Sequence, residues 1–154
     1  MKSKLLVCAM CLIAMTALAA KHTDFSGTWE LNAEKSKNIG MMAQMRMTQT
    51  IQQTQTALDV TTHTKFQDRD NDSKTHFDLT GKPITNEAPM QGPSQTVTKW
   101  QGPKLITTWT SDSAVSGAKV VRTETLSLSQ DGKTMTLESV RGSNSPLVMV
   151  FDRK

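Results

Sequence analysis

The chain has few of the residues that build cross-links and aromatic clusters. Its 154 residues include no tyrosine, aromatic side chains make up 5%, and there are two cysteines. Cys8 and Cys11 both lie in an apolar stretch near the N-terminus. The rest of the chain therefore forms no disulfide and offers no thiolate as a metal ligand or nucleophile.

Signatures of catalysis are also missing. The sequence contains no nucleophile–base motif around a serine, no H-E-x-x-H pair and no glycine-rich phosphate loop. Basic and acidic residues are interspersed, without the basic tract that binds nucleic acid. We expect neither an enzyme nor a nucleic-acid-binding protein, and no cofactor.

The first 20 residues predict a secretory signal. Lys2 and Lys4 begin it, an apolar run follows, and Ala17 and Ala19 stand at the two positions that decide cleavage. The run is shorter than the ~20 residues of a membrane-spanning helix. We expect cleavage near Ala19 or Ala20, no stable membrane span afterwards, and secretion, into the periplasm if the host is Gram-negative.

The remaining residues, 21–154, predict a single monomeric domain. Removing Lys2 and Lys4 lowers the formal net charge from +4 to +2. Roughly 130 residues are enough for one hydrophobic core and too few for two.

Period-two alternation of apolar and polar residues recurs along this domain, with turn residues at short intervals. The pattern predicts an all-β fold, an antiparallel up-and-down β-barrel of about eight to ten strands, since closure removes exposed strand edges. Residues 39–47 are expected to be a loop or short helix to about Ala43, then a strand. The expected strands are Phe25–Asn32, Met45–Gln53, Leu58–Phe66, Lys74–Leu79, Ile84–Glu87, Gln95–Trp100, Leu105–Ser111, Val120–Leu128, Thr134–Arg141 and Leu147–Arg153.

Three turns predict hairpin registers that place apolar residues opposite one another on one face. The expected pairs are Leu128 with Met135, Leu126 with Leu137, Glu124 with Ser139 and Arg122 with Arg141 about Asp131-Gly132; Trp100 with Leu105, Thr98 with Thr107 and Thr96 with Trp109 about Gly102-Pro103; and Thr62 with Phe77 and Val60 with Leu79 about Arg69-Asp70.

The segment D-F-S-G-T-W-E-L at residues 24–31 resembles the first strand of lipocalins and intracellular fatty-acid-binding proteins. In both families a Gly-x-Trp sets the indole across the closed end of the barrel, which implies this role for Gly27 and Trp29. The longer motif, through Ser36, resembles small secreted bacterial lipocalin-like proteins. Such families place a basic residue over the tryptophan from the last strand, which implies that role for Arg153.

The resemblance has one departure. Fatty-acid-binding proteins hold the ligand carboxylate with an Arg-x-Tyr on the last strand, whereas Met149-Val150-Phe151 stands at the corresponding place here. A fatty acid is therefore not assumed to be the ligand.

Two arginines are expected opposite each other on the inner face. Like charges across a strand pair are unfavourable, and a buried unpaired guanidinium costs more. Either an anionic or strongly polar ligand group meets Arg122 and Arg141, or both lie at the barrel rim in water.

The aromatic side chains on the inner face line either a ligand cavity or a filled core. Threonines on the same face favour a cavity, because buried hydroxyls need hydrogen-bond partners. The candidate ligand-binding residues are Met45, Met47, Phe77, Trp100, Trp109, Arg122 and Arg141.

Metal sites have weaker support. Met41, Met42, Met45 and Met47 are either soft ligands for Cu(I) or Ag(I) or flexible apolar filling. His63 and His76 are expected opposite each other on the outer face, too few for zinc. The aspartates at 68, 70 and 72 imitate a calcium loop, but Ser73 replaces the required glycine.

Three hypotheses follow. The first is a secreted lipocalin-like barrel that holds or carries a small hydrophobic or amphipathic molecule. The second is a soft-metal-binding protein built on the methionine cluster. The third is a solid barrel that acts as a structural or interaction protein of the cell envelope.

Overall fold

The computed structural model describes residues 22–88, 92–113 and 117–154. The secretory signal predicted for residues 1–20 lies outside this part of the chain. The described residues form the strands β1 (Gly27–Leu31), β2 (Arg46–Gln53), β3 (Ala57–Phe66), β4 (Arg69–Asp78), β5 (Ile84–Ala88), β6 (Gly92–Gln101), β7 (Lys104–Asp112), β8 (Lys119–Leu128), β9 (Thr134–Arg141) and β10 (Leu147–Arg153), and one short 3₁₀ helix, η1 (Gly40–Gln44).

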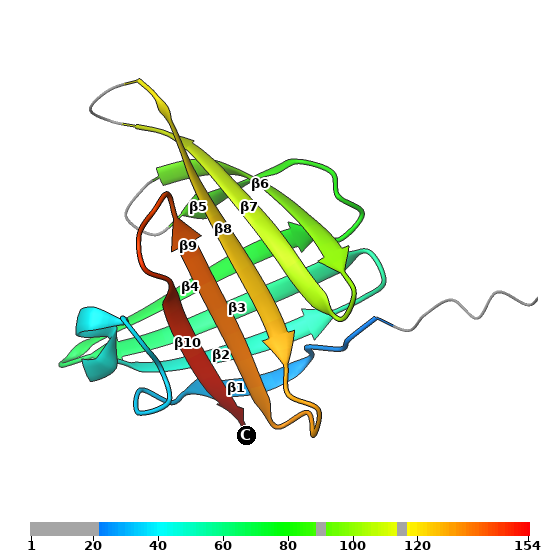
Figure 1. The fold of residues 1–154 in the computed structure, drawn as a ribbon. Helices are drawn as coiled ribbons and strands as arrows, with labels where there is room; N and C mark the ends of the chain where they lie inside the picture. The colour runs from blue at the N-terminus through cyan, green and yellow to red at the C-terminus, as the bar shows by residue number, and fades with distance from the viewer. Residues whose placement is uncertain (1–21, 89–91, 114–116) are drawn as a thin grey trace, which may run out of the picture.

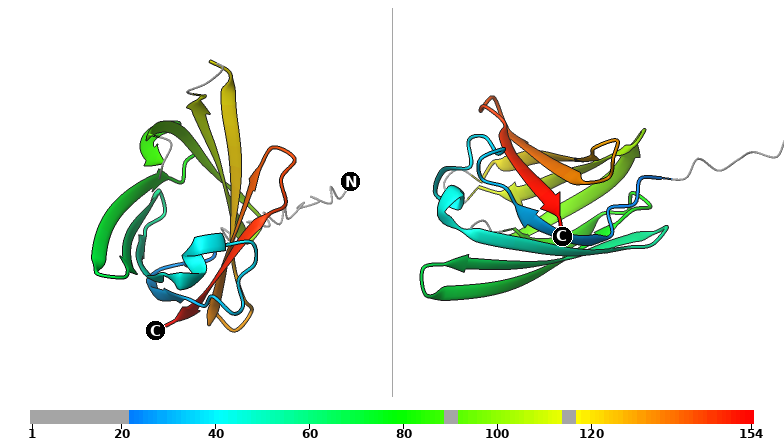
Figure 2. Two further views of the ribbon diagram at one scale, coloured as in Figure 1. Left: turned by 90° about the vertical axis from the view of Figure 1, so that its left-hand side faces the viewer. Right: turned by 90° about the horizontal axis from the view of Figure 1, so that it is seen from below.

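All ten strands belong to one antiparallel sheet, in the order β4-β3-β2-β1-β10-β9-β8-β7-β6-β5 (Figure 1). β1 pairs with β10, so the first and last strands lie side by side and the two ends of the sheet are β4 and β5. The sheet curls into a nearly closed barrel in which β4 and β5, its two ends, approach each other (Figure 2). The predicted all-β up-and-down barrel is confirmed. Within the described residues, no helix has the length and apolar character needed to cross a membrane.

Two of the predicted hairpin registers are confirmed. About Asp131-Gly132, Leu128 pairs with Met135 and Arg122 with Arg141. About Gly102-Pro103, the pairs include Trp100 with Leu105, Thr98 with Thr107 and Thr96 with Trp109. Both glycines adopt positive φ angles, of 70° at Gly132 and 59° at Gly102, which glycine tolerates without strain.

The third register is wrong. The turn is formed by Gln67 and Asp68, with Gln67 at φ 55°, so Phe66 pairs with Arg69 and β4 begins inside the predicted loop. Phe77 therefore pairs with Leu58 instead of Thr62. Residues 69–73 are all polar and exposed. The sequence was therefore interpreted as a turn, although these residues form the solvent-facing start of β4.

The histidine pair expected from that register is also absent. His63 pairs with Asp72, and His76 with Asp59. The displacement is an even number of residues, which leaves each side chain on its expected face because the side-chain period of a strand is two. Phe77 accordingly remains on the inner face.

The short helix and the strand after it follow the prediction for residues 39–47. The helix η1 begins at Gly40, and β2 begins at Arg46.

The apolar core fills the end of the barrel where β1 begins. Its buried members are Phe25, Trp29, Ile51, Leu58, Leu79, Leu105, Met135 and Phe151. Trp29 is fully buried and donates a hydrogen bond from Nε1 to the carbonyl oxygen of Phe25, at 2.9 Å. The apolar core therefore closes this end of the barrel.

Arg153 covers the indole of Trp29 and ties the chain ends together. Its guanidinium carbon lies 4.1 Å from the centre of the Trp29 ring. Nη1 donates to the carbonyl oxygen of Ser26 and Nε to that of Gly132, each at 2.9 Å. Gly27 has φ +134°, and a Cβ there would lie 2.5 Å from Nη1 of Arg153, so the site requires glycine. The structure thus places Gly27, Trp29 and Arg153 in one closing contact.

Candidate ligand-binding site

The interior becomes more polar with distance from the Gly102-Pro103 turn. Next to the turn, the inner positions of β6 and β7 are Trp100 and Leu105, and further along they are mostly hydroxyl residues. The buried hydroxyl side chains are Ser94, Thr96, Thr98, Thr107 and Ser111. An amphipathic molecule is matched by this change from apolar to polar lining.

Most of these hydroxyls have hydrogen-bond partners within the protein. Thr98 and Thr107 share a hydrogen bond of 2.9 Å across β6 and β7. Thr96 donates to the carbonyl oxygen of Ile84 at 3.3 Å and accepts from Nδ2 of Asn86 at 2.9 Å. The threonines at 96, 98 and 107 therefore do not by themselves require internal water or a ligand, contrary to the sequence argument.

A charged pair lies beside this band, on the inner face of β8. Arg122 and Glu124 are two residues apart on one strand, so both point inward, and each side chain is 16% exposed. Arg122 lies opposite Trp109 in the register, with its guanidinium carbon 4.7 Å from the centre of the indole ring. Trp109 in turn donates from Nε1 to Oε2 of Glu124 at 2.7 Å.

The electrostatics of this group are set mainly by burial. Desolvation raises the pKa of Glu124 above its usual value, while the charge of Arg122 and the hydrogen bond from Trp109 act in the opposite direction. Nε of Arg122 lies 3.3 Å from Oε1 of Glu124, close enough for ionic attraction. The two atoms are not aligned as a hydrogen bond, and Nε is a buried donor without a partner among the described residues. A buried donor left unpaired costs about 1–3 kcal/mol, which a bound acceptor would recover.

Phe77 completes the group from the opposite end of the sheet. Its ring meets that of Trp109 edge to face, with centres 5.8 Å apart and an interplanar angle of 86°. The structure thus brings together three of the predicted site residues: Phe77, Trp109 and Arg122. We call these three residues and Glu124 the polar centre.

The other predicted site residues lie elsewhere. Trp100 is at the closed end, stacked against Phe25 with ring centres 6.1 Å apart. Met47 packs against the apolar core, and Met45 is half-buried beside η1. Arg141 is exposed although it pairs with Arg122 in the register. Of the two alternatives for these arginines, burial therefore holds for Arg122 and the solvated rim for Arg141.

Sequence reasoning missed two residues that organise the site. Glu124 is predicted only as the partner of Ser139, although its spacing of two residues from Arg122 on an inward face is a sufficient signal. Asn86 gave no signal. Its amide donates to the carbonyl oxygen of His76, at 2.7 Å, and so joins β5 to β4 where the ladder is interrupted.

Each outer-face histidine lies within hydrogen-bond distance of an aspartate. Nδ1 of His63 lies 2.6 Å from Oδ1 of Asp72, and Nδ1 of His76 lies 2.7 Å from Oδ1 of Asp59. The described residues contain no group of three or more histidine, cysteine or acidic side chains able to hold a metal.

The methionine cluster is divided. Met41, a residue of η1, is 72% exposed, whereas Met47 on β2 packs against the apolar core. Soft-metal binding by these methionines stays a prediction.

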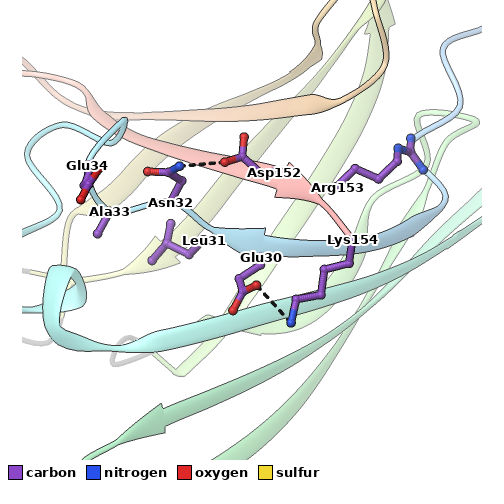
Figure 3. Close-up of a pocket in the computed structure, with 8 residues that line it drawn as sticks. All are labelled: Glu30, Leu31, Asn32, Ala33, Glu34, Asp152, Arg153 and Lys154. Carbon is purple, nitrogen blue, oxygen red and sulfur yellow. Dashed lines mark hydrogen bonds and ion pairs between the residues drawn. The ribbon is translucent and has the colours of Figure 1, made fainter.

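A concavity with a volume of about 380 Å³ lies on the outside, where β1 meets β10 (Figure 3). Several of its charged side chains contact one another or a neighbouring side chain. Nζ of Lys154 lies 3.1 Å from Oε2 of Glu30, and Asn32 donates to Asp152 at 2.7 Å. Lys35 also binds Asp152 and, with Asn32, lowers the pKa of its carboxyl. The polar groups that line this concavity are therefore paired within the protein, whereas the polar centre contains an unpaired buried donor.

Comparison with known proteins shows the fold. No protein-family model matches the sequence, and no curated protein matches it. The fluorescent protein UnaG (N57A mutant) is 16% identical, with a TM-score of 0.66 over 84% of this chain and 96% of that one. The REP1-NXSQ fatty acid transporter is 15% identical, with a TM-score of 0.65 over 84% and 95%. Fatty-acid-binding protein 1 of Echinococcus granulosus is 11% identical, with a TM-score of 0.65 over 84% and 96%. At these identities the likeness is one of fold alone: this chain is similar in architecture to the three proteins just named.

Proposed function

We propose that this protein is an exported, non-enzymatic binding protein that holds a small hydrophobic or amphipathic molecule inside its barrel. The polar group of that molecule contacts the polar centre, with Arg122 as the principal donor. The observation that carries the proposal is the buried Nε of Arg122, which has no hydrogen-bond partner among the described residues.

The position of Arg122 favours a bound ligand whose polar group points toward β8. The last strand offers no such contact, because Phe151 is fully buried in the core and Met149 packs against it. The structural neighbours include a fatty acid transporter and a fatty-acid-binding protein, which supports a hydrophobic ligand without naming it. In this chain the polar contact is on β8 and not on β10.

The chemical group of the ligand that Arg122 prefers depends on whether the carboxyl of Glu124 is protonated. With Glu124 ionised, the pair is neutral and favours an uncharged polar group. With Glu124 protonated, which burial promotes, the guanidinium charge is free for a carboxylate, sulfonate or phosphate. Binding of an anion is therefore coupled to protonation of Glu124, and it takes up a proton wherever Glu124 is ionised in the ligand-free protein.

The test is a fluorescence titration of the processed protein with anilinonaphthalene sulfonate, an apolar dye that carries an anionic group. A long-chain carboxylate and the alcohol of the same chain length then compete with the dye. Arg122→Met is compared with Arg141→Met, which removes the exposed arginine at the paired position.

We expect saturable dye binding, and carboxylate affinity about tenfold or more weaker in Arg122→Met, since a hydrogen bond to a charged group contributes about 1.5–3 kcal/mol. Alcohol affinity should fall less than carboxylate affinity, because a hydrogen bond to a neutral acceptor contributes only about 0.5–1.5 kcal/mol. Arg141→Met should bind both ligands like the wild type. No saturable binding in the wild type would indicate a filled barrel and contradict the proposal. Equal losses in both variants would show that the polar centre is not where the ligand binds.

A further inference from the structure

We infer that the ligand of the barrel has a polyhydroxylated head group, a sugar or a glycerol linked to an apolar chain. The inference deepens the function proposed above and rests on it, because it names the chemistry of the ligand's polar end. It follows from the register of the inward side chains, which changes from apolar to hydroxyl-bearing between two adjacent rows.

The change is clearest on the wall formed by β6 to β10. Residues that pair across an antiparallel ladder lie side by side, so a row of inward side chains can be followed from strand to strand. One row is apolar and consists of Trp100, Leu105, Leu126, Leu137 and Met149. The next row away from the closed end is polar and consists of Thr98, Thr107, Glu124 and Ser139. The boundary between lining for an apolar chain and lining for a polar group is therefore sharp.

The wall formed by β2 to β4 repeats this division. Phe77 on β4 contacts Trp109 on β7, so the inner faces of the two walls point toward each other (Figure 2). A row of Ile51, Val60 and Thr75 is followed, further from the closed end, by a row of Gln49, Thr62 and Ser73. We call the two polar rows, together with the polar centre, the polar half of the barrel.

The charged groups of the polar half compensate one another. Nε of Arg122 lies 3.3 Å from Oε1 of Glu124, and the other side chains of the two polar rows are hydroxyls and one amide. Hydroxyl and amide groups both donate and accept hydrogen bonds, as the hydroxyls of a sugar or a glycerol do. A carboxylate only accepts, so it would leave the acceptors of this lining without a donor. The lining therefore matches a head group with several hydroxyls better than a lone carboxylate.

Part of this hydrogen-bonding capacity is not used within the protein. The half-buried hydroxyls of Thr75 and Ser139 make no hydrogen bond to another described residue. Oγ1 of Thr62 accepts from Nε2 of Gln49 at 3.4 Å but donates to no described residue. Nε of Arg122 adds a buried donor that is likewise unpaired within the described segments. These groups lie on both walls, and several hydroxyls on one head group can bond to them at the same time.

The experiment extends the dye competition described above to three octyl compounds: octanol, the octyl ether of glycerol, and octyl β-glucoside. The apolar chain is the same in all three, and only the number of hydroxyls in the head group increases. We expect the glycerol ether or the glucoside to bind at least about tenfold more tightly than octanol, because each added neutral hydrogen bond raises affinity about two- to tenfold. The tighter of the two probes distinguishes a glycerol head group from a sugar.

Threonine-to-valine variants locate the contact. Thr62→Val and Thr75→Val each remove an inward hydroxyl and keep a β-branched side chain suited to a strand. Thr61→Val removes an exposed, outward hydroxyl from the same strand as Thr62 and is the matched control. Each inward variant should weaken binding of the tighter polyhydroxylated probe about two- to tenfold and octanol binding less. Thr61→Val should bind all three compounds like the wild type, and circular dichroism melts establish that every variant is folded.

The outcomes separate this inference from the function on which it rests. Saturable binding of the dye and of a carboxylate, with neither polyhydroxylated probe tighter than octanol, would overturn the inference and leave the proposed function intact. Equal effects of Thr61→Val and the inward variants would also overturn it, since the head group would then lie outside the polar half. The absence of saturable dye binding would contradict both.

Discussion

Replacing Trp29 with alanine tests whether the closing contact of Trp29 and Arg153 holds the barrel together. The indole is fully buried in the core, and truncating such a side chain typically costs about 3–5 kcal/mol. The change also leaves the carbonyl oxygen of Phe25 without its donor and removes the surface on which Arg153 stacks, a contact of about 0.5–2 kcal/mol. These contributions overlap, and we expect a loss of about 4–5 kcal/mol in the free energy of unfolding.

A loss of this size is a large fraction of the stability of a small domain, which is typically about 5–15 kcal/mol. We therefore expect a Tm lowered by about 15 °C or more, or a protein already unfolded at room temperature. Circular dichroism melts and denaturant titrations of the processed protein measure the change.

A double-mutant cycle separates the stacking contact from the burial of the indole. Trp29→Leu, Arg153→Met and the double variant should give a coupling free energy of about 0.5–2 kcal/mol. Exposed Arg141→Met is the control for loss of an arginine and should leave the Tm unchanged. A Trp29→Ala protein that melts within about 2 °C of the wild type would refute the reasoning, since core truncations of this size shift Tm by several times more.

Three further predictions concern other points of the barrel. Gly27→Ala should destabilise the protein by at least about 1 kcal/mol, because a non-glycine residue is strained at φ +134° and its Cβ would also clash with Nη1 of Arg153. A denaturant titration that gives wild-type stability would contradict this. Asn86→Leu should remove the hydrogen bond that joins β5 to β4 and so increase the rate of amide hydrogen exchange in those two strands. Exchange in β9 and β10 should not change. Burial raises the pKa of Glu124 in the folded protein, so the folded state holds this proton more tightly than the unfolded chain does; the wild type should therefore lose stability relative to Glu124→Gln as pH rises from the unfolded value near 4.5 through the raised pKa. Chemical denaturation of both proteins across that pH range measures the difference, and a gap that does not change with pH would contradict the role of burial.

Local patterns were sufficient to predict most of the sheet. A two-residue turn such as Asp131-Gly132 joins strands that are adjacent in sequence, so its position determines which residues pair. Alternation then decides which side chains share a face. Where the turn was misplaced, between β3 and β4, the displacement was even and Phe77 stayed on the inner face. Sequence patterns were therefore enough to predict the fold class, the pairing in two of the three hairpins and the inward face of the strands in all three.

The contacts of the inward side chains depend instead on the three-dimensional arrangement of the whole barrel. Arg122 and Arg141 are paired by register, yet the first lies in the interior against Trp109 and the second in water. Phe77 reaches Trp109 from a strand far along the sheet order, and His22 reaches Trp100 from outside the sheet altogether. Such contacts depend on how strongly the whole sheet curls, which sums small twists over all its strands and is not encoded in any one hairpin. The position along the barrel also matters, because a long side chain is buried midway along a strand and solvated at its end, and no local pattern distinguishes the two.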